Sequence, residues 1–374
     1  MFDFKKTTSS PFIAFVLLFL PAVTATICAN AFADLLYGPL ESFLSPLLEK
    51  ISNWPNLPYA LLGGDYGLIA MFPFLILYAL PTIIAFSIIL AIYQSTGLTQ
   101  QISLALEKWL RPFGLGAQEL VRVVMGFGCN VPAVVSSRGC SSCSRGACIS
   151  AISFGSACSY QLPATLAVFA AAGMAYLGGV YLFLLALTTL IYLRFTTPKV
   201  LRQARAKNTE SQNTKPPALR KPSWKAVNEE LAENLKQFVV MSLPVFVAIC
   251  FTAAILNWLG ILPKIGTILS PLMALFNLPG DSAMAVVFGS IRKDGIAVGL
   301  LDSESGALKV AIDSPAQVLT AVYLSGVLLP CIVTVFTIVR EMKWKFALKL
   351  CGRQMAWAAG FSVLIAWITP LIIR

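Results

Sequence analysis

The sequence lacks histidine and carries few charges. None of its 374 residues is histidine, and charged residues make up 12% of the chain against 57% hydrophobic residues. A soluble globular domain carries about 25% charged residues. The absence of histidine excludes chemistry that depends on imidazole, so a metal site must use sulfur, carboxylate, amide or backbone oxygen. The scarcity of charge excludes an ordinary soluble domain and indicates a protein embedded in lipid.

The sequence also lacks the phosphate-binding loop of P-loop enzymes. It contains no G-x-x-x-x-G-K-[ST] motif and no Gly-Lys dipeptide. We therefore expect a transporter, with no tightly bound cofactor, and no nucleotide hydrolysis on these residues.

Long apolar runs predict an all-α, polytopic membrane protein. A helix needs about 20 apolar residues to cross a bilayer, and we expect about eight to ten transmembrane or re-entrant helices in two gate halves. Acidic residues predominate in residues 34–65, which we place outside, and basic residues in 98–122, 196–235 and 340–353, which we place inside. The expected spans are residues 11–33, 66–92, 147–170, 173–195, 236–259, 314–338 and 354–373.

A basic segment separates the two halves. Between Lys199 and Lys225 there are eight Lys or Arg residues and one acid, Glu210. A nucleic-acid site is the alternative, but the place between spans favours a cytoplasmic loop near lipid headgroups. We expect an N-terminal span, resembling a signal segment, with an outer loop at 1–65, gate repeats at 66–196 and 236–374, and the basic linker at 197–235.

The two halves resemble each other in sequence. "VVMGFGCNVPAVV" (residues 123–135) aligns without gaps to "VVFGSIRKDGIAV" (residues 286–298), and "LPATLAVF" (162–169) to "LPCIVTVF" (329–336). Two matches in the same order indicate an internal duplication. Duplicated halves with interrupted apolar segments at matching positions are typical of transporters, whose binding sites lie at the interruptions.

Glycine, proline and charge interrupt these apolar segments. A broken helix exposes backbone groups that lipid cannot satisfy, so the break must face protein or a water-filled path. A kink used for close packing is the alternative, but charges in such a segment are costly and mark a pathway or a pair. The expected gate backbone residues are Gly126, Gly128, Pro132, Pro163 and Pro330, and the expected second gate charges are Arg292, Lys293 and Asp294.

Three of the nine cysteines accompany the interruptions, namely Cys129, Cys158 and Cys331. Thiolates prefer soft or borderline cations such as Fe(II), Zn(II) or Cu(I). We predict that these cysteines line a metal path, to which Asn130 adds an amide oxygen. The alternative, that cysteine is a small buried hydrophobe, is our interpretation of Cys28, Cys250 and Cys351.

A second cysteine group, "RGCSSCSRGAC", contains Cys140, Cys143 and Cys148. Its C-x2-C-x4-C spacing suits an auxiliary metal or redox site, but it has no fixed fourth ligand for closed structural zinc. An ion access site, a redox-sensitive gate and loose thiols all stay open.

These residues together resemble the membrane domain of the ferrous iron transport protein B (FeoB) family. Its G-F-G-C-N-V-P-A motif is present at residues 126–133, and "ACSYQLP" (157–163) is similar to its S-C-x-A-R-L-P motif. "GSIRKDG" (289–295) and "LLPCIVTVFTIVREMKWKFAL" (328–348) are similar to its second gate and C-terminal motifs. The resemblance covers roughly residues 66–374.

The resemblance implies Fe(II) uptake across the bacterial inner membrane, with Fe(II) as the transported ion and Cys129, Cys158 and Cys331 in its path. The family carries a GTPase domain, so the resemblance implies either a separate GTPase or function without one. A small accessory protein and a homo-oligomer are further expected partners, and nucleic acid is not. "YQSTG" (93–97) replaces the family's L-E-D-S-G stretch, and the additional thiols favour a softer site, so zinc, cobalt and copper stay alternatives.

Three alternatives to metal transport stay open. Similar gate repeats occur in nucleoside-recognition-type membrane proteins, which suggests an organic solute as cargo. A membrane redox or metal sensor would use the Cys140, Cys143 and Cys148 group instead. A membrane redox enzyme would hold an iron–sulfur cluster on its cysteines.

Overall fold

The computed structural model describes residues 11–64, 67–69, 76–77, 80–127, 129–158, 161–199, 219–293, 295–301 and 307–372. Within these residues the chain is helical, and its one extended pairing is a bridge between Leu301 and Leu308. The predicted all-α class is therefore confirmed. The α-helices are α2 (Pro11–Ser52), α3 (Asn56–Leu62), α5 (Leu80–Thr96), α6 (Leu98–Leu110), α7 (Ala117–Met125), α8 (Asn130–Ser136), α9 (Ser142–Gly155), α10 (Gln161–Ala171), α11 (Leu177–Thr196), α13 (Trp224–Gln237), α14 (Leu243–Trp258), α15 (Ile261–Met273), α16 (Ala283–Ile291), α17 (Gly295–Leu300), α18 (Pro315–Val327), α19 (Ile332–Met342) and α20 (Trp344–Ile372).

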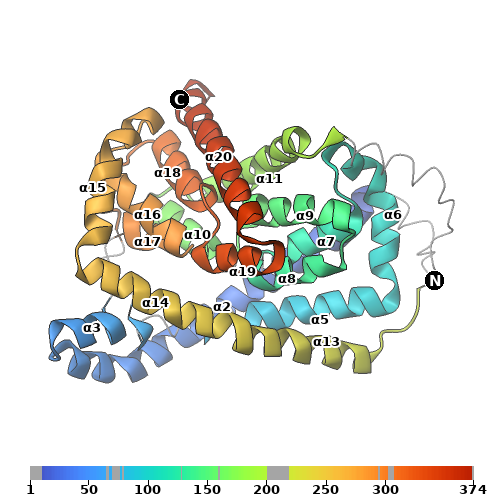
Figure 1. Cartoon of the computed structure of the whole chain (residues 1–374), viewed down its shortest axis with the longest axis horizontal. Helices are drawn as coiled ribbons and strands as arrows, with labels where there is room; N and C mark the ends of the chain where they lie inside the picture. The colour runs from blue at the N-terminus through green and yellow to red at the C-terminus, as the bar shows by residue number, and fades with distance from the viewer. Residues whose placement is uncertain are drawn as a thin grey trace.

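Short helices occupy the middle of the molecule and longer ones lie around them (Figure 1). Helices α7 to α10 and α16 to α19 form the central group, while α2, α5, α13 and α14 run along one side. Helix α13 packs on α5, and α5 packs on α2. The end of the predicted linker is therefore a helix packed against the first half.

Helix α2 corrects the predicted outer loop, because it continues to Ser52 through three prolines. A proline removes the donor to the carbonyl four residues earlier, and other groups satisfy two of these carbonyls. The Tyr93 hydroxyl donates to the Leu17 carbonyl freed by Pro21, at 2.5 Å. The Ser45 hydroxyl donates to the Ser42 carbonyl freed by Pro46, at 3.1 Å. Residues 34–52 are therefore helical.

The predicted span 147–170 is also wrong, because two helices share it. Helix α9 ends at Gly155 and α10 begins at Gln161. The Ser156 hydroxyl donates to the Val123 carbonyl of α7 at 2.7 Å, and this bond fixes the chain where it leaves the helix. Pro163 lies in the first turn of α10, where a missing N–H leaves no helical bond unmade.

Three helical stretches in the described residues are long and apolar enough to cross a membrane. They are Leu177–Thr196, Pro315–Met342 and Trp344–Leu371. The pair Cys250–Trp258 and Ile261–Phe276, bent by 78°, makes a fourth if it is one span. Shorter apolar helices, such as α10, cannot cross alone and suit re-entrant pairs. Exposed apolar side chains on α11, α15 and α20 give these helices a lipid-compatible outer face.

A polar and aromatic network joins the central helices. The rings of Phe154 and Tyr192 stack with centroids 4.4 Å apart. The Ser153 hydroxyl donates to the Gln354 side chain at 2.6 Å, and Gln354 donates to the Val327 carbonyl at 2.7 Å. These contacts hold α9, α18 and α20 together. They therefore fix the positions of the ends of α9 and α18, where the chain leaves the helix.

Candidate functional site

The first interruption lies between α7 and α8. Helix α7 begins where Glu119 accepts a hydrogen bond from the Gly116 N–H, at 2.9 Å. After Gly126 the chain leaves the helix, and Cys129 is extended with φ −151° and ψ 132°. A Cβ at Gly126 would lie 2.5 Å from the Ser156 hydroxyl and 2.9 Å from Asn130 Oδ1. Glycine is therefore needed at 126, because the end of α7 closely approaches Ser156, the first residue after α9.

The second interruption, between α16 and α17, repeats this geometry. Arg292 aligns with Cys129 in the two repeats and is also extended, with φ −140° and ψ 143°. Gly289 aligns with Gly126, and a Cβ there would lie 2.8 Å from the Ser325 carbonyl of α18. Matching positions thus share both the break and the close approach to a neighbouring helix, which supports the duplication seen in the sequence.

The other two cysteines of interest lie at two further helix breaks, close to the second pair of aligned segments. Cys158 is buried between α9 and α10, and Cys331 is the N-terminal cap residue of α19, after the break that follows α18. The Cys331 thiol and the Thr334 hydroxyl are 3.0 Å apart. Pro330 is buried beside Cys331, and Pro132 lies in the first turn of α8. Each predicted gate proline therefore lies next to a helix start, where its missing N–H is tolerated.

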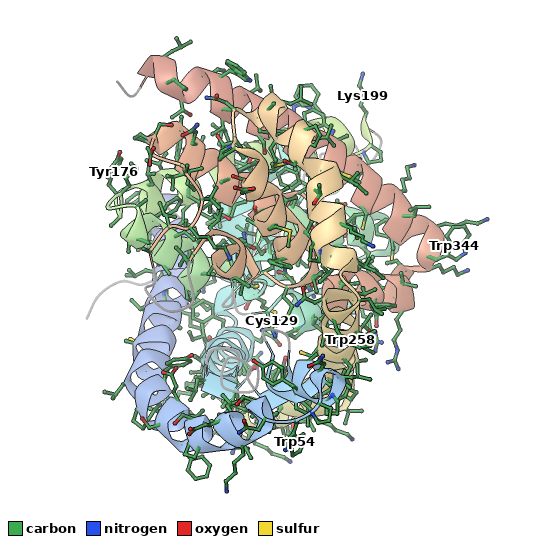
Figure 2. All side chains as sticks on the ribbon, turned by 90° about the vertical axis from the view of Figure 1, so that its left-hand side faces the viewer. Trp54, Cys129, Tyr176, Lys199, Trp258 and Trp344 are labelled. Atoms are coloured by element: carbon green, nitrogen blue, oxygen red, sulfur yellow. The ribbon has the colours of Figure 1, made fainter. Side chains whose placement is uncertain are left out.

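The structure brings the three predicted thiols toward one another. Cys158 and Cys331 both lie within electrostatic range of Cys129. Cys129 lies near the middle of the molecule, whereas Trp54 and Trp344 lie at its edges (Figure 2). Within the part of the chain that the structure describes, no three His, Cys, Asp or Glu side chains are arranged to hold a metal ion. The thiols thus form a loose cluster and not a closed ligand set.

Asn130 and Lys293 occupy matching positions of the two repeats and differ in chemistry. Asn130 is buried, and its Oδ1 has no hydrogen-bond partner among the described residues. Lys293 is 4% exposed, and its ammonium donates to the Gly326 carbonyl at 2.6 Å and to the Leu329 carbonyl. The ammonium also lies within electrostatic range of Cys331 and Cys158. One repeat therefore brings an open acceptor to the region, and the other brings a cation.

Of the remaining predicted gate residues, Arg292 contacts a cysteine outside the loose thiol cluster, and the others lie outside the described residues. Arg292 is buried, and its Nη1 donates to the Cys250 thiol of α14 at 3.8 Å. Cys250, which we had interpreted as a small hydrophobe, therefore also accepts a hydrogen bond. Gly128, Asp294 and the Cys143 side chain lie outside the described residues.

Two members of the second cysteine group meet beside a buried carboxylate. Cys140 and Cys148 are hydrogen-bonded through their side chains, and neither forms a disulfide. The Cys148 thiol lies 3.9 Å from the Glu119 carbonyl. The Glu119 carboxylate also accepts a hydrogen bond from Ser144, at 2.7 Å. This pair is chemically able to form a disulfide.

A second polar cluster joins the two halves. The Glu341 side chain, 4% exposed, pairs with Arg138 at 2.6 Å and with Arg145 at 2.7 Å. Arg138 binds both carboxylate oxygens, because its Nε also donates at 2.8 Å. Since Arg138 and Arg145 flank α9's start and Glu341 ends α19, this cluster ties the first repeat to the second.

Several residues of the site carry no signal that sequence reasoning could use. The carbonyls of Gly326 and Leu329 belong to backbone, which every residue has. Gln161 donates to the Tyr181 hydroxyl at 2.6 Å, next to Gly326, and such pairs are visible only after folding. Glu341 lies within the C-terminal motif at residues 328–348, but its two arginine partners lie some 200 residues earlier in the chain.

Helices interrupted at matching positions, with thiols and buried cations at the breaks, define a gate-type polytopic membrane protein. The family model that matches the sequence is Gate, described as nucleoside recognition, and it matches residues 76–173 and 239–345, together more than half of the chain. The chain belongs to this Gate family. Each matched range contains one of the two interruptions, the first between α7 and α8 and the second between α16 and α17.

Curated relatives confirm the resemblance to FeoB. The chain is 28% identical over 242 residues to the Fe(2+) transporter FeoB of Legionella pneumophila strain Lens, covering 60% of this chain and 32% of the relative. It is 26% identical to that of Methanocaldococcus jannaschii, covering 75% and 44% respectively, and 24% identical to that of Synechocystis sp., covering 86% and 52%. The chain thus spans between a third and about half of these relatives. No solved structure matches it.

Proposed function

We propose that this protein carries a divalent transition-metal ion, Fe(II) in the first place, across the bacterial inner membrane. The observation that carries the proposal is the approach of Cys129, Cys158 and Cys331 to one another from three separate helix breaks. Its relatives are named Fe(2+) transporters. Thiolates select borderline cations such as Fe(II) over Mg²⁺ and Ca²⁺.

The looseness of the thiol cluster suits transport better than storage. A conducted ion must bind well enough to enter and weakly enough to leave, usually through several successive sites. Three thiols within electrostatic range, but without a closed ligand set among the described residues, fit successive contacts. The free Asn130 oxygen would add a neutral ligand beside Cys129. Cys129, Cys158, Cys331 and Asn130 are therefore the proposed path residues.

A separate GTPase and a small accessory protein are the further partners that we propose for this transport. Assembly of several copies is a further proposal, in which each copy keeps its own cluster of Cys129, Cys158 and Cys331.

The test is metal influx into anaerobic proteoliposomes that contain the full chain. Fe(II), Zn(II), Co(II) and Mn(II) are compared for the intact protein and for Cys129→Ser, Cys158→Ser and Cys331→Ser. Cys351→Ser on α20 is the matched control, because this half-buried cysteine belongs to none of the breaks. We expect influx of one metal, lost in the three path variants and kept in the control.

Other outcomes would point elsewhere. Influx that survives all three path substitutions would contradict a thiol-lined path and favour an organic solute as cargo. If no metal enters, the assay is repeated with a candidate GTPase and GTP. Continued absence of flux would reject the proposal.

A further inference from the structure

Lys293 is a buried ammonium that backbone carbonyls hold in place. Its side chain is 4% exposed, and the carbonyls of Gly326 and Leu329 accept its hydrogen bonds. A charge removed from water is costly unless it is paired or hydrogen-bonded. Two backbone carbonyls of the second repeat therefore bind the Lys293 ammonium, a cation that belongs to the chain itself.

The Gly326 carbonyl belongs to the last turn of α18, and the Leu329 carbonyl lies two residues beyond the end of this helix. Helix α18 ends at Val327, and the last four carbonyls of a helix have no partner within it. The aligned peptide dipoles add partial negative charge at the same end. We call the carbonyls of Gly326 and Leu329 the α18 carbonyl end. Backbone carbonyls arranged in this way are what ion filters use to replace the water around a cation.

The α18 carbonyl end is held in a fixed position. A Cβ at Gly326 would lie 2.5 Å from Gln161 Nε2 and 3.1 Å from the Tyr181 hydroxyl, so the backbone is pressed against that hydrogen-bonded pair. Gln354 holds the next carbonyl, that of Val327. A rigid pair of oxygens is a better cation site than a flexible one, because it needs no ordering when the cation binds.

The same place lies against the proposed metal path. The Lys293 ammonium is within electrostatic range of Cys331 and Cys158. A second cation close to the ammonium would be repelled strongly, since a site shielded from water screens charge poorly. In the matching position of the first repeat, Asn130 offers an open oxygen in place of a cation.

We propose that Lys293 is a tethered cation, which occupies the α18 carbonyl end while the path is empty and is displaced when a divalent metal ion arrives. This inference rests on the proposed function. The α18 carbonyl end is then a cation site that either the Lys293 ammonium or a divalent metal ion can occupy. By competing for this site, Lys293 weakens metal binding so that the ion can leave.

The experiment measures Co(II) binding to the purified full chain under anaerobic conditions, by the near-ultraviolet absorbance of thiolate-bound Co(II). Lys293→Gln removes the charge but keeps N–H groups that can donate to the carbonyls, and Lys293→Arg keeps the charge. Lys309→Gln is the matched control, because this exposed lysine also donates to a backbone carbonyl, that of Val298. Lys293→Met provides a second uncharged variant if the glutamine variant is not monodisperse.

We expect Co(II) to bind about tenfold more tightly to the uncharged variants, while Lys293→Arg and Lys309→Gln stay within about threefold of the unchanged protein. In proteoliposomes, Co(II) influx by Lys293→Gln should have a lower KM and a lower maximal rate. A purely structural lysine would give equal or weaker Co(II) binding in Lys293→Gln, and that result would overturn the inference while the proposed function stood. If neither the unchanged protein nor Lys293→Gln binds Co(II), both fall.

Discussion

The Glu341 cluster gives a prediction whose size can be worked from the structure. Glu341→Gln keeps the shape of the side chain but leaves two guanidinium groups without their carboxylate. A hydrogen bond to a charged group contributes about 1.5 to 3 kcal/mol when it is shielded from water. An exposed pair contributes about 0.2 to 1 kcal/mol.

The two arginines differ in exposure, so they should contribute differently. The Arg138 side chain is 61% exposed and belongs to the weak class, although it binds both carboxylate oxygens. The Arg145 side chain is 21% exposed and lies closer to the shielded class. We therefore expect Glu341→Gln to lower the free energy of unfolding by about 2 kcal/mol, with the larger share from Arg145.

The assay is unfolding of the full chain in mixed micelles as the fraction of denaturing detergent rises, followed by circular dichroism. Double-mutant cycles with Arg138→Gln and Arg145→Gln separate the two pairs. Glu229→Gln, at an exposed glutamate of α13, is the control and should change stability by less than about 0.5 kcal/mol. A similarly small effect of Glu341→Gln, or a stronger coupling to Arg138 than to Arg145, would refute the reasoning.

Three further predictions use contacts of the central helices. Gly126→Ala should lower the free energy of unfolding by about 1 to 3 kcal/mol and abolish metal influx, because the new Cβ would lie 2.5 Å from the Ser156 hydroxyl oxygen. Gly179→Ala is the control and should change neither quantity, because no atom lies within 4 Å of a Cβ at that position. Gln354→Leu should cost about 1 to 3 kcal/mol in that unfolding assay, because it leaves a buried carbonyl and a hydroxyl unbonded; a neutral effect would mean that the network is not structural. Treatment with diamide should convert Cys140 and Cys148 to a disulfide, detected by thiol titration and peptide mass, and Cys140→Ser should prevent it; two free thiols after treatment would contradict their contact.

Much of the architecture was predictable because membrane segments obey simple rules. A charge content of 12% and long apolar runs leave only helices as a way to satisfy the backbone in lipid. The breaks near Gly126 and Arg292 were predictable as well, since glycine, charge and the internal match mark them. Helix α2 was missed beyond residue 33, because Pro39 and Pro46 interrupt that stretch. Only the structure shows that the Ser45 hydroxyl donates to the Ser42 carbonyl that Pro46 leaves without a backbone donor.

The candidate site also has a part that could be predicted from the sequence and a part that could not. The candidate metal ligands are visible in the sequence, because sulfur and amide oxygen are properties of the side chains of Cys129, Cys158, Cys331 and Asn130. That Lys293 donates to the carbonyls of Gly326 and Leu329, and that Arg292 donates to the Cys250 thiol, follows from the packing of the helices alone. The physical reason is that backbone carbonyls carry no sequence signature, so a site built from them exists only once distant helix ends have packed together.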